Sequence, residues 1–190
     1  LGLQMLLYLF ALEQEGGALF GGKEIVPAGV LYTPAREPML RCARNTADET
    51  IEKARKKELR RSGMVLEDPA VLEAMEHDAL DAPEYLPIAV KKGGALSGSL
   101  ASEGQFAKLA KYVDRVLREI ADEVFAGNIN ADPYARTPQQ SACTYCEFAS
   151  ACHFENGRGG DHMEYIKATK TDEFWSYIDE VNGEGGRKNG

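Results

Sequence analysis

This sequence has no basic segment ahead of its first apolar run, and no apolar run long enough to cross a bilayer. A secretory signal peptide would need the first feature, and a transmembrane helix would need roughly 20 consecutive apolar residues. The opening run, residues 1–12, has neither property. We therefore expect a cytoplasmic protein with no membrane partner. Because the run starts at Leu1 rather than at a methionine, we also expect it to continue a helix of a longer protein.

An excess of positive charge is missing as well. The 190 residues include 22 Lys and Arg against 30 Asp and Glu, which gives a formal net charge of −8. Free-standing nucleic-acid-binding domains are usually basic, so this balance argues against such a domain, although not against one face that contacts DNA within an assembly. The basic stretch Lys53–Arg61 is interrupted by glutamate, and the Glu52–Lys56 spacing is typical of a solvated helix face. Phosphate contact is the alternative for that stretch. His77 and His162 are predicted to be surface residues.

No internal repeat organises the chain, so its fold is predicted from local patterns. These patterns predict an α+β fold, mostly helical with a few antiparallel strands. Helices are predicted over residues 1–15, 47–61, 69–77, 103–125 and 172–181, strands over 24–33 and 164–167, and a hairpin over 84–100 with its turn at Gly93–Gly94.

Several of the predicted helices carry further expectations. The helix over 103–125 has apolar residues at i, i+3, i+4 and i+7, so it should pack against a core along one side. The helix over 1–15 is apolar nearly all round and should be buried. Thr46 and Glu49 have the spacing of a capping box for the helix that follows them. Asp68 precedes a proline and should cap the helix over 69–77.

Cysteine is scarce, with four residues at uneven spacing, but three of them form a C-x2-C-x5-C segment: Cys143, Cys146 and Cys152. In a reducing compartment, clustered cysteines bind metal more often than they form disulfides, and thiolates select zinc or iron–sulfur clusters over hard cations. The candidates for a fourth ligand are His153, Cys42 or a cysteine outside this sequence. Zinc accepts imidazole, whereas an iron–sulfur cluster usually takes four thiolates, so the spacing leaves both open. Buried thiols without metal are the third interpretation.

Gln4 and Tyr8 lie four residues apart in the first predicted helix, so their side chains share a face. In an apolar helix, a buried polar pair must reach hydrogen-bond partners, because an unsatisfied amide is costly. One interpretation is that the pair serves a functional site. The other is structural: Gln4 caps a neighbouring backbone, and Tyr8 is a core aromatic with its hydroxyl at the surface.

The first helix and the cysteine segment together resemble a known family. Residues 2–9, Gly-Leu-Gln-Met-Leu-Leu-Tyr-Leu, resemble the helix that follows the catalytic strand in RecB-like nucleases of the PD-(D/E)XK superfamily. The cysteine segment is similar to the one that, in AddB proteins, ties down the end of the nuclease domain through a 4Fe-4S cluster. Residues 27–36, 62–68 and 91–96 extend the likeness, which covers about residues 1–154.

The resemblance implies that Gln4 and Tyr8 support an active site, and that Cys143, Cys146 and Cys152 are three of the four ligands of a 4Fe-4S cluster. It places the fourth cysteine, the Mg2+-binding carboxylates and the catalytic lysine upstream of this sequence. No catalytic residue is therefore expected here, and the fragment alone should be inactive. The implied whole is an ATP-binding helicase–nuclease subunit that forms a heterodimer with the AddA helicase–nuclease subunit. It would act on double-stranded DNA ends and single-stranded DNA in recombinational repair.

The expected organisation follows from this likeness. It comprises the C-terminal part of a RecB-like nuclease domain over 1–142, an iron–sulfur cysteine segment over 143–156, a strand and helix over 157–182 and a disordered tail over 183–190. Two other interpretations of the residues compete with it: a small zinc-binding interaction module closed by His153 or Cys42, and a scaffold domain without metal. Iron and sulfide in the protein would favour the nuclease, and stoichiometric zinc would favour the module.

Overall fold

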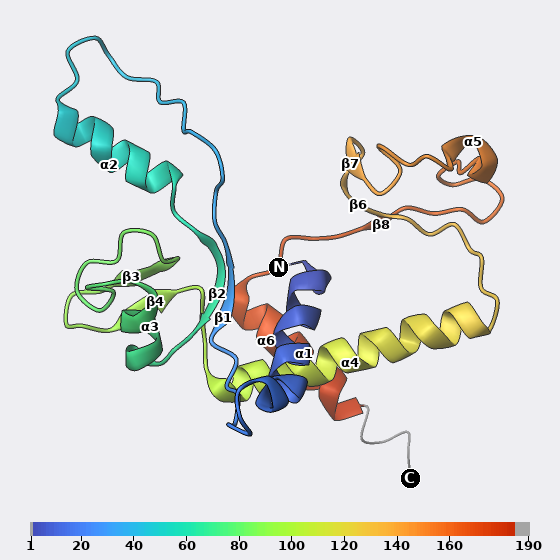
Figure 1. The fold of residues 1–190 in the computed structure, drawn as a ribbon. Coiled ribbons are helices and arrows are strands. Elements are labelled where there is room, and N and C mark those ends of the chain that lie inside the picture. The colour runs from blue at the N-terminus through green and yellow to red at the C-terminus, as the bar shows by residue number, and fades with distance from the viewer. Residues whose placement is uncertain (1, 185–190) are drawn as a thin grey trace. The chain divides into compact units, whose positions relative to one another are not determined.

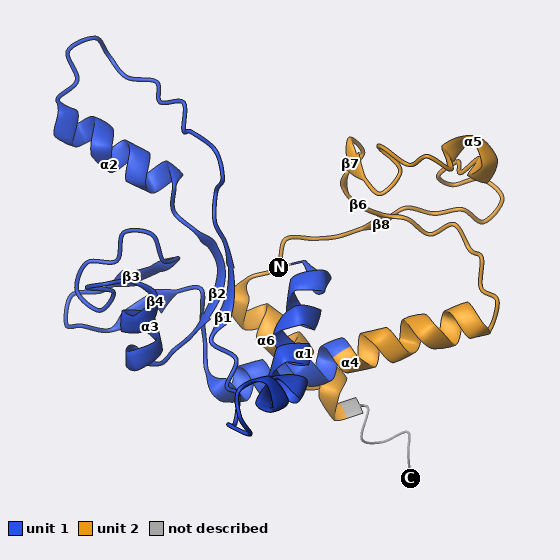
Figure 2. Ribbon diagram, in the orientation of Figure 1, with its two compact units in different colours: residues 1–113 blue, residues 114–190 orange. Residues whose placement is uncertain are grey.

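A computed structural model describes residues 2–184 of the protein as an α+β fold (Figure 1), which confirms the predicted class. Its elements in chain order are α1 (Leu3–Leu19), β1 (Gly29–Tyr32), α2 (Asp48–Glu58), β2 (Ser62–Leu66), α3 (Pro69–Met75), β3 (Ile88–Val90), β4 (Leu96–Gly98), β5 (Leu100–Ala101), α4 (Glu103–Phe125), β6 (Tyr134–Thr137), β7 (Gln140–Ser141), α5 (Ala149–Cys152), β8 (Glu164–Tyr165) and α6 (Thr171–Glu184). The chain divides into two units, residues 1–113 and 114–190 (Figure 2).

The strands of the described residues form small sheets with mixed pairing. In the first sheet, β1 pairs antiparallel with β2, and β2 pairs parallel with β5. Strands β3 and β4 form the predicted antiparallel hairpin, with Gly94 N donating to Lys91 O at 3.0 Å in its turn. In the third sheet, β6 pairs antiparallel with β7 and parallel with β8. The predicted antiparallel strands are thus present, and β5 and β8 add parallel pairs, because each reaches its partner after a long connection, which permits parallel entry.

The core of the first unit forms around β2, α3 and β3. Its buried members are Val65, Leu72, Ala79, Leu86 and Ile88, each at most 1% exposed. The cap predicted for α3 is present, since Val71 N donates to Asp68 Oδ1 at 3.0 Å. Burial of apolar area at about 25 cal/mol per Å2 makes this cluster the element that holds α3 and the hairpin to the first sheet.

Strand β2 begins directly after the residues predicted for the preceding helix, which itself ends earlier than predicted. Helix α2 ends at Glu58, and Arg61 N then donates to Tyr85 O at 2.8 Å, which directs the chain into the sheet. Glycine is required at position 63, because its φ is +141° and a Cβ would lie 2.0 Å from the carbonyl oxygen of Val30. The close approach of β1 to β2 therefore depends on Gly63.

The start of α2 also differs from the prediction. The helix begins at Asp48, and its first turn has no side-chain cap from Ala47. The hydroxyl of Thr46 donates at 2.8 Å to the carbonyl of Ala43, in the loop before the helix. The predicted capping box was wrong, because the loop geometry uses the Thr46 hydroxyl before α2 begins.

Helix α1 is more exposed than predicted. Only Leu6, Phe10 and Gly16 are buried within it, and Gly16 packs so closely that a Cβ would lie 3.2 Å from Ile25 Cγ1. Leu12, on another face, is 52% exposed. The expectation of burial all round was wrong, because the described residues cover one stripe of the helix and leave its other apolar side chains open.

Helix α4 has the predicted bounds, but its apolar stripe is buried along half its length only. Phe106, Leu109 and Val113 are buried, whereas Val124 is 70% and Phe125 is 90% exposed. The predicted packing along one side is therefore confirmed for the first half of the helix. The period of the sequence predicted the stripe, and only the tertiary structure shows how far its cover extends.

The predicted strands are shorter in the structure. Strand β1 covers residues 29–32 of the predicted 24–33, and β8 covers 164–165 of the predicted 164–167. Strands β6 and β7 lie in a stretch for which no strand was predicted. Strands this short are decided by the segments that pair with them, rather than by their own residue preferences.

In the second unit, the last helix is joined to α4 by the Arg115 guanidinium, which donates to the carbonyl of Val181. Within the helix, Ile178 is fully buried, and the neighbouring rings of Phe174 and Trp175 pack edge to face with centroids 5.0 Å apart. Helix α6 runs through residues 183 and 184, where a disordered tail was expected to begin, and residues 185–190 of that tail lie outside the described residues. Within residues 2–184, no helix combines the length and apolarity that crossing a membrane would need.

Candidate functional site

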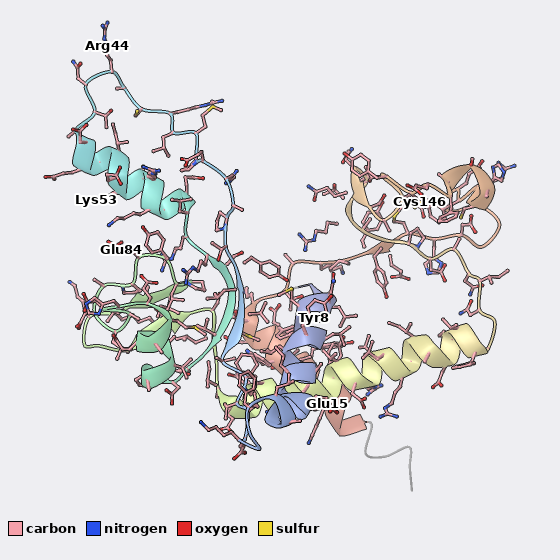
Figure 3. The ribbon with its side chains drawn as sticks, viewed as in Figure 1. Tyr8, Glu15, Arg44, Lys53, Glu84 and Cys146 are labelled. Carbon is pink, nitrogen blue, oxygen red and sulfur yellow. The ribbon has the colours of Figure 1, made fainter. Side chains whose placement is uncertain are left out.

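The polar pair on α1 is joined by a hydrogen bond. Gln4 Nε2 donates to the hydroxyl of Tyr8 at 2.8 Å, so the prediction that the two side chains share a face is confirmed. Tyr8, marked on α1 in Figure 3, is 54% exposed. The structural interpretation was wrong, since the Gln4 amide bonds a side chain rather than a backbone group and Tyr8 is not a core aromatic. The pair is accessible from solvent.

The first sheet positions the start of α1. Gly2 N donates to the hydroxyl of Tyr32, at the end of β1, over 2.9 Å. The approach is close enough that a Cβ on Gly2 would lie 3.3 Å from the same hydroxyl. Because β1 is itself paired with β2, the sheet determines where α1 begins. It thereby determines where Gln4 and Tyr8 lie in the first unit.

The three cysteines of the C-x2-C-x5-C segment line one hollow in the second unit. The hollow has a volume of about 290 Å3, and Asp132 and Phe154 also contribute to its wall. Cys143 is partly buried, whereas Cys146 (marked in Figure 3) and Cys152 are exposed. All three are free thiols. The structure therefore brings these predicted residues to one place.

Two tight turns bend the chain around this hollow. Cys146 N donates to Cys143 O at 3.3 Å, and Cys152 N donates to Phe148 O at 2.9 Å within α5. His153 then ends α5 with a left-handed backbone, φ 52°. Short local hydrogen bonds, rather than a buried core, thus shape the cysteine segment.

The donor set fits an iron–sulfur cluster in its chemistry and is one ligand short of it. Thiolates are the donors that such clusters take. Among residues 2–184, no three side chains of His, Cys, Asp or Glu come together as they would around one metal ion. A zinc ion draws four donors to about 2.0–2.3 Å from one point, whereas a cluster spreads its thiolates over several metal atoms. Either site would need at least one donor besides the three thiols.

Neither of the two candidates for a fourth ligand within this sequence lines the cysteine hollow. His153 follows Cys152 in the chain but does not line the cysteine hollow. Cys42 is exposed and belongs to the first unit, where it lines a different hollow beside α2.

A histidine that the sequence suggested only as a surface residue joins two segments beside the cysteine hollow. His162 Nδ1 lies 2.8 Å from Asp132 Oδ1, and its Nε2 lies 2.7 Å from Glu164 Oε1. The hydrogen bond with Glu164 and the negative charge of Asp132 raise the pKa of His162. Asp132 is distant in the sequence, so no local pattern could have revealed the contact.

Comparison with known proteins identifies the family of the chain. A protein-family model described as the PD-(D/E)XK nuclease superfamily matches residues 1–153. The matched region contains Gln4 and Tyr8 at its start and Cys143, Cys146 and Cys152 at its end. One family model therefore covers both of the candidate sites.

Curated proteins similar to the chain are named as a subunit of an ATP-dependent helicase/deoxyribonuclease. The protein from Clostridium kluyveri (strain NBRC 12016) is 32% identical over 180 residues, which cover 93% of this chain and 16% of that protein. The protein from Thermoanaerobacter sp. (strain X514) is 31% identical over 188 residues, covering 97% and 16%. The protein from Acetivibrio thermocellus is 33% identical over 180 residues, covering 94% and 16%. The chain thus spans about a sixth of the length of these relatives.

Proposed function

Because the chain belongs to the PD-(D/E)XK nuclease superfamily, we propose that it forms the C-terminal part of the nuclease domain in the AddB component of an AddAB-type helicase–nuclease. The observation that carries the proposal is the single family match over residues 1–153, which joins the Gln4–Tyr8 helix to the cysteine segment. The name shared by the relatives, a helicase/deoxyribonuclease subunit, supports DNA as the substrate. The whole subunit would work in the cytoplasm with AddA, resecting double-strand DNA ends for recombinational repair.

The contribution of α1 to the reaction would be to hold a phosphate oxygen. In the hydrogen bond between the two side chains, Gln4 is the donor and the Tyr8 oxygen is the acceptor. The hydroxyl proton of Tyr8 is then left to point away from Gln4, toward an acceptor outside the helix. A non-bridging oxygen of a DNA phosphate is such an acceptor. Gln4 therefore orients the Tyr8 hydroxyl, and Tyr8 binds the strand.

The metal chemistry of the enzyme lies with residues that we place outside this chain. The chemistry that Mg2+ supplies in such nucleases is polarisation of the scissile phosphate and a lower pKa for the attacking water. Within residues 2–184, no cluster of carboxylates is arranged to hold a metal ion. We accordingly propose that the chain by itself is inactive, and that it acts only as part of the longer subunit.

The cysteine segment would bind a 4Fe-4S cluster through Cys143, Cys146 and Cys152, with a fourth cysteine from elsewhere in the subunit. Bound there, the cluster supplies a covalent cross-link between distant parts of the chain. The segment has little else to hold it, because it is shaped by local turns and its α5 has no buried residue. A structural role is therefore proposed, in which the cluster orders this end of the nuclease domain.

Cleavage assays on the intact subunit with its helicase partner would test this function. Tyr8→Phe removes the hydroxyl and Gln4→Ala removes its orienting donor, and each should lower Mg2+-dependent DNA cleavage by at least about tenfold, as loss of one well-placed donor does elsewhere. Because the pair is solvent-exposed, neither change should alter the thermal midpoint appreciably. Gln14→Ala, at another exposed position of α1, is the matched control and should cleave at the normal rate. An intact subunit that cleaves no DNA with Mg2+ would refute the proposal.

A further inference from the structure

Positive charge is gathered on one projecting segment of the first unit, residues 33–61, which we call the arm. The arm contains nine Lys and Arg against five Asp and Glu and so carries a charge of +4, which leaves −12 on the remainder of a chain whose net charge is −8. Helix α2 forms one side of the arm and has no buried residue. Figure 1 shows the arm extending away from β1 and β2. An acidic protein that gathers its cations on one segment has a surface suited to an anion.

Some of the arm's cations are already used to attach it to the rest of its unit. Lys56 Nζ lies 2.5 Å from Glu84 Oε1. The guanidinium of Arg60 donates to the backbone carbonyls of Leu86 and Ile88. These contacts anchor the base of the arm and account for the two side chains that make them.

Five other cations of the arm have no ion-pair partner among the described residues: Arg41, Arg44, Lys53, Lys57 and Arg61. Figure 3 marks Arg44 on the loop before α2 and Lys53 on the helix itself. Lys53 and Lys57 are spaced i, i+4 on α2, where like charges repel each other. A solvated helix face accounts for the paired cations, whereas the cations without an ion pair are free to contact an anion outside the chain.

A hollow between α2 and the loop before it lies beside these cations. It has a volume of about 460 Å3, and Arg41 and Lys57 contribute to its wall. Met39, Leu40 and Ile51 give it an apolar lining, and Met39 is 96% exposed. The open apolar surface can contact the flat face of a base, and the neighbouring cations can contact its phosphate.

We propose that the arm binds single-stranded DNA, with phosphates held by Arg41, Lys53 and Lys57 and an unstacked base resting against Met39 and Ile51. In a duplex the bases stay paired and stacked, so the apolar lining would have no occupant. A single strand exposes the faces of its bases together with a continuous row of phosphates. The proposal rests on the proposed function for DNA as the polyanion, and it adds a second contact to the strand, outside the Gln4–Tyr8 pair.

Fluorescence anisotropy with a labelled oligothymidylate tests the proposal, on the 190-residue chain and on the intact subunit, without Mg2+ and over a series of salt concentrations. Lys53→Ala/Lys57→Ala should weaken binding about tenfold at low salt and reduce the salt slope by about 1.4, since each phosphate contact on a single strand contributes about 0.7. Lys91→Ala/Lys92→Ala, at the exposed turn between β3 and β4, makes the same change in charge away from the arm and should leave both quantities unchanged. Circular dichroism melts of all variants should coincide with that of the wild type.

The apolar lining is tested separately. Met39→Ser should weaken binding of the oligothymidylate about fourfold, as expected for losing the equivalent of one buried methylene group, and should leave binding of a blunt duplex of equal length unchanged. Equal losses for single strand and duplex would overturn the assignment to single-stranded DNA.

Three other results would overturn the proposal. The first is an affinity of Lys53→Ala/Lys57→Ala that equals that of Lys91→Ala/Lys92→Ala at every salt concentration. The second is no binding of oligothymidylate by the wild type. The third is displacement of oligothymidylate by polyglutamate at equal charge. Cleavage by the intact subunit, measured with Mg2+ in a separate assay, reports on the proposed function alone. The failure of either proposal is therefore distinguishable from the failure of the other.

Discussion

The imidazole of His162 lies 2.8 Å, Nδ1 to Oδ1, from the carboxylate of Asp132. Its second nitrogen lies 2.7 Å from Glu164 Oε1 at the start of β8. Asp132 lines the cysteine hollow, so one ring links the wall of that hollow to the third sheet. The strength of this link depends on the charge of the ring, and therefore on pH.

The link predicts a pH-dependent stability. Glu164 and Asp132 raise the folded-state pKa of His162, so its stabilising contribution is fully present below the ordinary histidine pKa of about 6.5. The contribution is lost as the pH rises through the raised value. His162→Gln should therefore lower the thermal midpoint at about pH 6 and have a smaller effect at about pH 9, measured by circular dichroism melts.

His77→Gln is the matched control for this prediction, because His77 is exposed and lies 3.6 Å from Asp78, its immediate neighbour. It should shift the midpoint little at either pH. If His162→Gln lowered the midpoint equally at both values, its contacts would be stabilising through packing and not through the charge of the ring.

Metal content is predicted to depend on the cysteine segment. Purified without oxygen, the intact subunit should contain iron and sulfide, and Cys146→Ser should lose most of both, because a cluster needs its thiolates. Cys42→Ser, which changes an exposed thiol in the other unit, should keep the cluster. Elemental analysis for iron, sulfide and zinc measures the outcome. Stoichiometric zinc that is released by His153→Ala would instead identify a zinc module.

Glu13 is predicted to be a source of instability at neutral pH. Burial and, to a smaller extent, the nearby negative charge of Glu103 raise its pKa. A carboxyl whose folded-state pKa is raised opposes folding once it is ionised. Glu13→Gln should therefore increase the free energy of unfolding at pH 7, by a few tenths of a kcal/mol because the side chain is only partly buried.

The gain from Glu13→Gln should disappear below about pH 4, where the wild-type carboxyl is protonated as well. Urea melts at the two pH values measure it. Glu15→Gln, at an exposed position of the same helix (marked in Figure 3), is the control. An equal gain from both variants would trace the effect to the net charge of the protein instead.

Glu76 is predicted to be a structural carboxylate. It ends α3 and accepts hydrogen bonds from three successive backbone nitrogens, those of Glu84, Tyr85 and Leu86, the last at 2.7 Å. Glu76→Ala would leave these N–H groups, of which those of Tyr85 and Leu86 are partly buried, without an acceptor and should cost about 1–3 kcal/mol of unfolding free energy. Glu67→Ala, an exposed glutamate after β2, should cost less than about 0.5 kcal/mol. Similar losses in urea melts of the two variants would contradict this role.

Local patterns predicted several features of the molecule correctly. The period of apolar residues over 103–125 predicted α4 with its observed bounds, Asp68 was identified as the cap of α3, and Gly93–Gly94 marked the turn of the β3–β4 hairpin. In each case, the signal lies within a few residues of the feature it specifies. The side-chain contact between Gln4 and Tyr8 belongs to the same class, because helix geometry alone brings i and i+4 together.

Features that depend on distant partners could not be obtained in this way. Strands β2 and β6 became strands because remote segments pair with them, and the parallel pairing of β5 and β8 depends on the path of long connections. Which apolar side chains of α1 and α4 are buried likewise depends on the segments that pack against each helix. The Asp132–His162 link and the Glu76 carboxylate join residues that no short pattern relates.

By itself, the sequence determined the residue types of the candidate sites: three thiols at C-x2-C-x5-C spacing, a Gln–Tyr pair on one helix face, and a stretch rich in Lys and Arg. The resemblance to RecB-like nucleases also came from the sequence, and the family match agrees with it. Only the tertiary structure decided that the thiols line one hollow, that the pair is exposed, and that Arg41, Arg44, Lys53 and Lys57 have no carboxylate partner among the described residues. The physical reason is range: hydrogen bonds along a helix or a turn are local in sequence, whereas burial and charge pairing are set by whichever distant segments fold alongside.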